Sequence, residues 1–143
     1  LLDDPGPEAQ RRRAGLLGVL CLAGRVAPCE DAVDILSSQG QAADADAAPL
    51  ASHGCGLGGL HSCVLAGDLA SAGRGMDRDR SLAVSSYARA CTGDARSGCE
   101  GLRELCRQGY LSGCETLLRS RDDASRPEPT SGSPEASAGE PTR

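Results

Sequence analysis

The chain has 143 residues, a formal net charge of −5 and a pI near 5.0, so we expect an acidic protein with one ordered domain. This charge disfavours polyanionic partners, and a chain with no Trp, no Phe and only two Tyr offers no stacking surface for single-stranded nucleic acid. We therefore expect no nucleic-acid partner, and a small core built from Leu, Val and Ala.

The N-terminal part has two interpretations. Residues 1–7 are acidic and contain two prolines, and we expect them to be disordered. Arg11–Arg13 and the apolar segment 14–24 superficially resemble a signal peptide, but acidic residues precede the arginines and Arg25 interrupts the apolar stretch. We favour an amphipathic helix instead, with no signal peptide in this chain. Its expected buried stripe is Leu16, Val19, Leu20 and Ala23.

The segment from Cys29 to Cys55 predicts one clear helix and one doubtful one. Apolar residues at 33, 35 and 36 indicate the first helix, which residues 37–40 end. Pro49 lies where a second helix is expected, and proline inside a helix costs about 3 kcal/mol. We therefore expect residues 41–48 to form a loop, and the second helix to start near Pro49 or to be short.

Residues 60–91 indicate a pair of antiparallel helices, because small and apolar residues recur at helical spacing. Paired glycines within 73–76 separate the two helices, and Asp77 or Asp79 can cap the second. Gly67 lies inside the first helix and suggests the close approach of another helix backbone. The predicted inward faces are Leu60, Cys63, Val64, Gly67 and Ala70, and then Ala83, Tyr87, Ala90 and Cys91.

After Cys99 the pattern becomes shorter. Leu102 and Leu105 continue the buried face, and Gly109 turns the chain into a closing half-repeat that contains Leu111, Cys114, Leu117 and Leu118. Residues 121–143 are rich in Ser, Pro and Glu and have no apolar anchor. We expect them to be disordered, which leaves residues 8–120 as the folded domain.

The cysteines repeat. A step of 36 residues carries Cys55 onto Cys91 and Cys63 onto Cys99. Self-similarity at such a period is typical of stacked arrays, in which each unit buries one face against its neighbour.

These features resemble the cysteine-rich branch of the Sel-one-like repeats, which are tetratricopeptide-like helical hairpins. The resemblance covers about residues 55–118 and implies an all-α fold: a short right-handed α/α solenoid of antiparallel helical hairpins cross-linked by disulfides. In that branch, the resemblance implies, a disulfide joins the cysteine that ends one hairpin to the next cysteine. The matching residues are Cys63, Gly67, Leu69, Gly73, Gly75, Met76, Asp79, Ala83, Tyr87, Ala90, Cys91, Gly98 and Cys99.

All eight cysteines share one spacing. Four pairs each enclose seven residues: Cys21 with Cys29, Cys55 with Cys63, Cys91 with Cys99 and Cys106 with Cys114. A turn at Gly93 and Asp94 would bring Cys91 and Cys99 within disulfide reach across a hairpin. Four disulfides imply an oxidising compartment, so we expect a periplasmic or secreted protein.

Metal binding is the competing use of cysteine. No two cysteines are as close as the two to four residues typical of structural zinc sites. His53 and His61 each lie two residues before a cysteine, and residues so spaced on a helix point to nearly opposite sides. We therefore predict no metal site and no cofactor.

Two function classes remain. Some Sel-one-like proteins carry a penicillin-binding or β-lactamase label, which makes a hydrolase of that type the enzyme alternative. A serine β-lactamase needs Ser-x-x-Lys and Lys-Thr-Gly motifs, and this chain contains no lysine. We favour a non-enzymatic scaffold whose concave surface binds a protein or peptide partner, with no membrane span.

Overall fold

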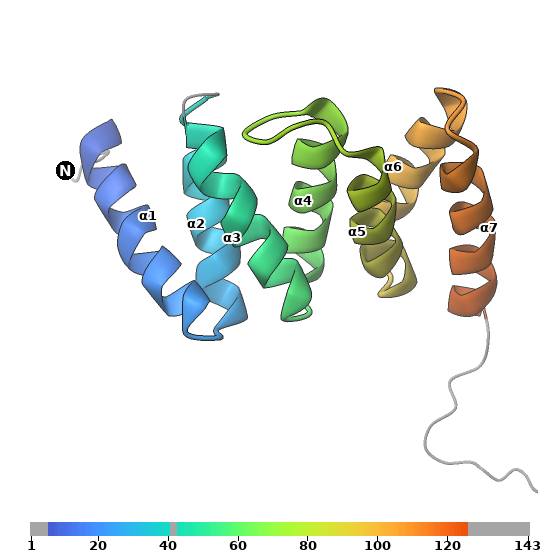
Figure 1. Ribbon diagram of the computed structural model, residues 1–143. Helices are drawn as coiled ribbons and strands as arrows, with labels where there is room; N and C mark the ends of the chain where they lie inside the picture. The colour runs from blue at the N-terminus through green and yellow to red at the C-terminus, as the bar shows by residue number, and fades with distance from the viewer. Residues whose placement is uncertain (1–5, 41–42, 126–143) are drawn as a thin grey trace, which may run out of the picture.

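The computed structural model describes residues 6–40 and 43–125 of the chain. Within these ranges all regular secondary structure is α-helical, so the all-α prediction is confirmed. Seven helices follow one another (Figure 1): α1 (Pro7–Leu22), α2 (Val26–Ser37), α3 (Asp44–Gly56), α4 (Leu60–Ala72), α5 (Arg80–Thr92), α6 (Arg96–Arg107) and α7 (Leu111–Ser125).

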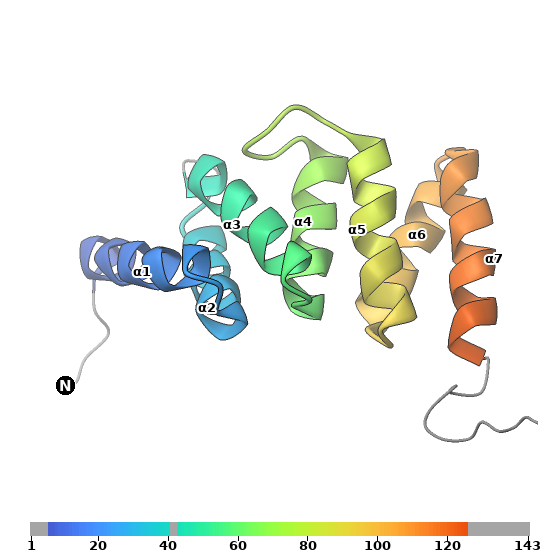
Figure 2. The same ribbon diagram turned by 60° about the horizontal axis from the view of Figure 1, so that its bottom comes forward.

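The helices stand side by side in a row that begins with α1 and ends with α7 (Figures 1 and 2). Each helix packs against the next one along the chain, and there are further contacts between α1 and α3, α2 and α4, α4 and α6, and α5 and α7. Contacts are therefore made between elements close in sequence, as the repeat pattern predicts.

Three-residue turns join four of the helix pairs. The C-terminal end of each preceding helix is followed by one residue with positive φ, a conformation that glycine adopts at little cost. These residues are Gly24, Gly58, Asp94 and Gly109. The predicted turns at Asp94 and Gly109 are thus confirmed, although Asp94 adopts the left-handed conformation without being glycine.

The connection between α4 and α5 is longer. Gly73 ends α4 in the left-handed conformation, and Asp79 caps α5 by accepting a hydrogen bond from the backbone N–H of Leu82 at 2.9 Å. Of the two aspartates considered for the cap, Asp79 is therefore the capping residue. The four residues predicted to face inward from α5 are all buried.

The loop predicted for residues 41–48 was wrong for residues 44–48, because α3 begins at Asp44 and contains Pro49 in its interior; residues 41 and 42 lie outside the described residues. Pro49 lies about one turn after the helix start and has no N–H to donate to the carbonyl of Ala45. Both residues are exposed. The first turn is held from outside: both Asp44 carboxylate oxygens accept hydrogen bonds from Arg74, at 2.9 and 3.1 Å. Tertiary contacts thus offset the cost of the proline.

The expected buried stripe of α1 was also wrong. The helix itself forms, but its inward residues are Ala14, Gly18 and Cys21. Small residues there allow α1 to approach α2 and α3 closely. The larger aliphatic residues point outward, with exposed fractions of 71% for Leu16, 66% for Val19, 39% for Leu20 and 64% for Leu22.

The Tyr87 ring fills the space between two helices in the C-terminal half. An added Cβ at Gly67 of α4 would lie 2.6 Å from the ring, and one at Gly101 of α6 would lie 2.5 Å from it. The close approach predicted at Gly67 is therefore made by a side chain and not by a helix backbone. The Tyr87 hydroxyl lies 2.5 Å from a carboxylate oxygen of Asp68, and burial together with this hydrogen bond raises the pKa of Tyr87.

Two larger apolar clusters form most of the core, and a third, smaller one contains Cys55, Cys63 and Ala90. The first joins α1 to α4 and contains mostly alanine with Val33, Leu36 and Leu69. The second joins α4 to α7 around Tyr87, and it includes the predicted Leu102 and Leu105. Of the three leucines in the predicted closing half-repeat, Leu117 is buried, whereas Leu111 and Leu118 are 71% and 63% exposed.

The first and last helices extend slightly beyond residues 8–120. Helix α1 begins at Pro7, a position that suits proline because the first helical N–H has no partner. Helix α7 continues to Ser125, since residues 121–125 contain no proline or glycine to end it. The rest of the segments predicted to be disordered, residues 1–5 and 126–143, lies outside the described residues. Among the described helices, none is both long and apolar enough to cross a lipid bilayer.

Candidate functional site

The eight cysteines lie near the ends of consecutive helices, one on either side of each three-residue turn. The structure joins the same four pairs that the spacing predicts: Cys21–Cys29, Cys55–Cys63, Cys91–Cys99 and Cys106–Cys114. Cα atoms within each pair are 4.4 to 4.6 Å apart, a separation that disulfides require. Helices α1 with α2, α3 with α4, and α5 through α7 are thereby covalently connected.

The two histidines considered as metal ligands do not meet at a shared site. Nε2 of His61 lies 2.9 Å from a carboxylate oxygen of Asp34 on α2, and both neighbouring cysteines are in a disulfide. In the described part of the chain, no three His, Cys, Asp or Glu side chains are arranged to hold a metal ion.

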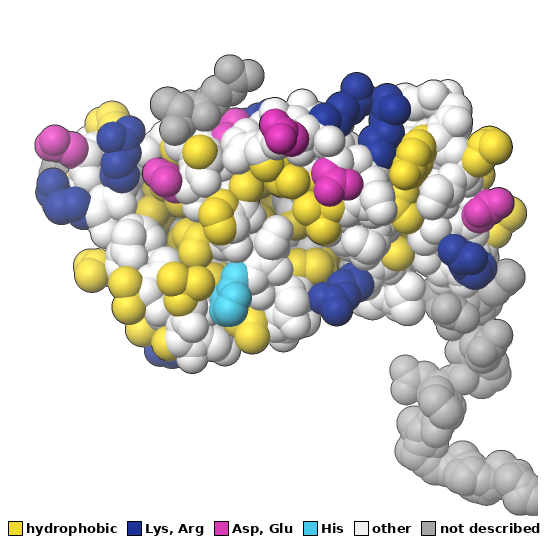
Figure 3. All heavy atoms as spheres, in the orientation of Figure 1, with side chains coloured by type: hydrophobic (Ala, Val, Ile, Leu, Met, Phe, Trp, Pro, Cys, Tyr) yellow, Lys and Arg dark blue, Asp and Glu magenta, His cyan; other side chains and the backbone are white. Residues whose placement is uncertain are grey.

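A groove of about 470 Å³ lies between α1 and α3, and we call it the first groove. Its walls are mostly apolar, with one basic residue, Arg11 of α1, and one acidic residue, Asp46 of α3. Figure 3 shows hydrophobic side chains gathered over α1 and toward α3 on this face. The first groove is lined by Gly18, Val19 and Leu22 of α1 and by Asp46, Pro49 and Leu50 of α3.

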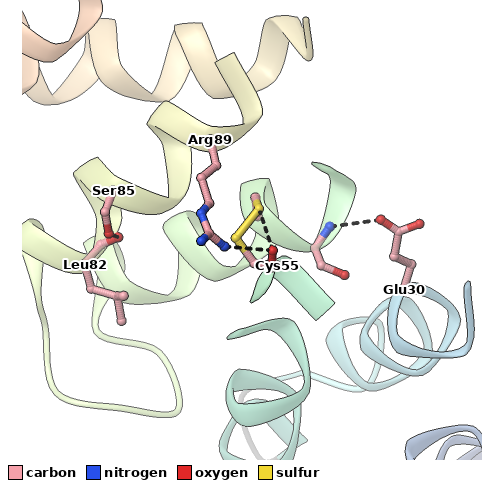
Figure 4. The surroundings of a disulfide bond; sticks show 7 residues. Glu30, Cys55, Leu82, Ser85 and Arg89 are labelled. Carbon is pink, nitrogen blue, oxygen red and sulfur yellow. Dashed lines mark hydrogen bonds between the residues drawn. A yellow bond between two sulfur atoms is a disulfide. The ribbon is translucent and has the colours of Figure 1, made fainter. Parts of the chain in front are cut away.

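A second groove, of about 230 Å³, lies between α3 and α5 and is polar. Arg89 extends across it and donates a hydrogen bond to the carbonyl oxygen of Cys55 at 3.0 Å (Figure 4). Beyond Arg89 the surface opens into a shallow hollow of about 630 Å³ beside the Cys55–Cys63 disulfide. The second groove is lined by Ser52 and Gly56 of α3 and by Leu82, Ser85, Ser86 and Arg89 of α5.

The serines of the second groove have no neighbouring base among the described residues. The Ser85 hydroxyl donates to the carbonyl oxygen of Leu82 at 3.0 Å, and the described lining of the groove contains no Asp, Glu or His. A nucleophilic serine needs an adjacent general base. The Arg89 guanidinium has only hydrogen-bond donors and no acceptor, so it cannot supply one.

The two grooves occupy equivalent positions in successive repeats. The step from Cys21 to Cys55 carries Gly18 and Leu22 onto Ser52 and Gly56. The step from Cys55 to Cys91 carries Asp46, Pro49 and Leu50 onto Leu82, Ser85 and Ser86. The same face of the molecule therefore presents an apolar groove and then a polar one.

The sequence predictions did not identify either groove. The available signal was the cysteine register. Aligned on it, Val19 and Leu22 of α1 correspond to the small or polar residues His53 and Gly56 of α3, and Arg89 and Thr92 of α5. Which of these residues line a surface depends on the spacing between α1, α3 and α5, and that spacing is a tertiary property.

Comparison with known proteins gave no match: no family model, no curated protein and no solved structure is similar to this chain at a significant level.

Proposed function

We propose that this chain is a protein-interaction scaffold, a short right-handed α/α solenoid of antiparallel hairpins of the Sel-one-like type. The row of helices supports this proposal, because each helix packs on its neighbours in sequence. The three-residue turns support it as well, since a chain that turns so tightly between helices reverses its direction. Helix α7 is the half-repeat at the end of the described array.

The repeated groove is the observation on which the function rests. Arrays of helical repeats use equivalent positions in successive units to bind an extended partner. Here the apolar first groove accepts aliphatic side chains, and the polar second groove supplies Arg89 and serine hydroxyls. A peptide or protein segment with an apolar part followed by a carboxylate matches both grooves in order.

We also infer that the protein acts in the periplasm or outside the cell. Four disulfides in a chain with an alanine-rich core suit an oxidising compartment. Cell fractionation with thiol labelling measures this directly: protein with all cysteines unreactive should be found only outside the cytoplasm.

Peptides selected by display on the oxidised protein test the binding function. Leu22→Glu introduces a charge into the first groove, and Ser85→Trp fills the second. Each substitution should reduce the affinity for a selected peptide about tenfold or more. Leu118→Glu is the matched control, because Leu118 is 63% exposed, close to the 64% of Leu22, and lies on α7 away from both grooves. Equal effects of Leu22→Glu and Leu118→Glu would contradict the proposal.

A further inference from the structure

Met76 lies in the connection between α4 and α5 and is the only methionine of the chain. The chain has no Trp, and all eight cysteines are in disulfides. The Met76 thioether is therefore the one sulfur that a mild oxidant can still oxidise, since peroxides convert methionine into its sulfoxide. Met76 is half-buried, so part of the residue is open to solvent.

The Met76 side chain packs against both of the larger core clusters, and no other described residue does so. The first cluster draws its residues from α1 to α4, and the second draws them from α4 to α7. Met76 thus lies where the two halves of the core adjoin. Methionine suits such a place, because its flexible side chain fills irregular gaps.

The tip of this connection, residues 75–77, has few other anchors. It reaches from the end of α4 toward the start of α3 (Figures 1 and 2). The backbone of residues 75–77 forms no hydrogen bond with another described backbone group. Gly75 touches the start of α3 through its backbone alone, and Asp77 is exposed. Met76 is therefore the one tip residue whose side chain packs against the core.

The connection crosses a junction that no described disulfide closes. Helices α3 and α4 form one disulfide-linked unit, and α5 to α7 form another. The second groove spans the same junction, because α3 provides one wall and α5 the other. Contacts across this junction, those of Met76 among them, set the spacing of the groove walls.

We propose that Met76 is an oxidation site whose sulfoxide loosens the junction between α4 and α5. The thioether sulfur donates an electron pair to one oxygen of hydrogen peroxide, and the O–O bond breaks. The hydroxide that leaves takes up the proton of the transferred oxygen, so the products are the sulfoxide and water. Sulfur loses two electrons and the peroxide gains two. Because a polar group packed against an apolar core without a partner is unfavourable, the sulfoxide leaves the core and releases the tip.

The same loosening affects the second groove, and this consequence rests on the proposed function. Oxidation should weaken a display-selected peptide that Ser85→Trp also weakens, by about tenfold. The two ideas can fail separately. Faster motion at the junction without a loss of affinity would contradict only the link to the groove, and failure to select any peptide would contradict only the proposed function.

Treatment of the disulfide-bonded protein with dilute hydrogen peroxide tests the oxidation site. Peptide mapping by mass spectrometry should locate one added oxygen atom on Met76. Hydrogen exchange should then become about tenfold faster at the backbone amides of the connection and of the first turn of α5. Amides of α1, which belongs to another disulfide-linked unit, should keep their rates.

Met76→Leu is the matched control, because leucine has nearly the same volume as methionine and cannot form a sulfoxide. This variant should exchange at wild-type rates both before and after peroxide. Met76→Gln, which carries a permanent polar group, should show the faster exchange without peroxide. The proposal is overturned if Met76 resists peroxide that oxidises free methionine, if complete oxidation leaves exchange unchanged, or if peroxide accelerates exchange equally in Met76→Leu.

Discussion

The ion pair between Asp44 and Arg74 connects the start of α3 to the loop after α4. Asp44 has a side chain that is 1% exposed, whereas the Arg74 side chain is 41% exposed. An added Cβ at Gly75 would clash with the Asp44 carbonyl, so the loop backbone lies directly against this turn. The two partners of the ion pair are therefore in very different surroundings.

This difference predicts unequal costs of removal. Arg74→Ala leaves a buried carboxylate without its partner, which typically costs about 3–5 kcal/mol of unfolding free energy. Asp44→Asn leaves an arginine that reaches water and an amide oxygen that can still accept one hydrogen bond, so about 1–2 kcal/mol is expected. Adding Asp44→Asn to Arg74→Ala should recover part of the loss, because the buried charge is then removed.

Urea unfolding of the oxidised proteins, monitored by circular dichroism, measures these free energies. Arg78→Ala is the control, since Arg78 lies in the same loop but donates from an exposed position to the carbonyl oxygen of Ser71; about 0–1 kcal/mol is expected there. The reasoning fails if Asp44→Asn costs as much as Arg74→Ala, or if the double variant is less stable than Arg74→Ala alone.

Three further predictions concern the disulfides, Tyr87 and the enzyme alternative. Reduction should abolish most of the helical signal, because each disulfide contributes ~2.5 kcal/mol by chain entropy. An unchanged melting curve would contradict this structural role. A link between Cys63 and Cys91 in a peptide map would contradict the pairing. Tyr87→Phe should cost about 1–2 kcal/mol in the same urea assay through the lost hydrogen bond to Asp68, and no loss would show that this bond is unimportant. A chromogenic cephalosporin should not be hydrolysed above background, and turnover that Ser85→Ala removes would revive the hydrolase alternative.

Local sequence patterns predicted helices α4 and α5 well. The faces of α5 and the glycine turns depend on spacing within one element and on the φ preference of glycine, both of which a sequence displays. The cysteine spacing likewise predicted four pairs that lie at bonding distance in the structure.

The incorrect predictions concern elements whose surroundings are tertiary. The local cost of Pro49 argued against a helix at this position. The contacts that hold the start of α3 come from Arg74 and Gly75, which are far away in sequence. In α1 the apolar spacing predicted the wrong buried stripe, because the alanine-rich core packs against the side of the helix that carries small residues. The size of the space between helices cannot be read from one helix alone.

The disulfides divide the chain into three covalently closed units: α1 with α2, α3 with α4, and α5 with α6 and α7. Among the described helices, no disulfide joins α2 to α3 or α4 to α5, so apart from the backbone only noncovalent contacts hold these two junctions. Under a pulling force, or during partial opening, an oxidised molecule should therefore extend first at these two junctions. The length of each extension step should depend on the length of the linker at that junction. The Asp44–Arg74 ion pair joins the second unit to the loop that leads to the third, so its loss should ease separation of those units.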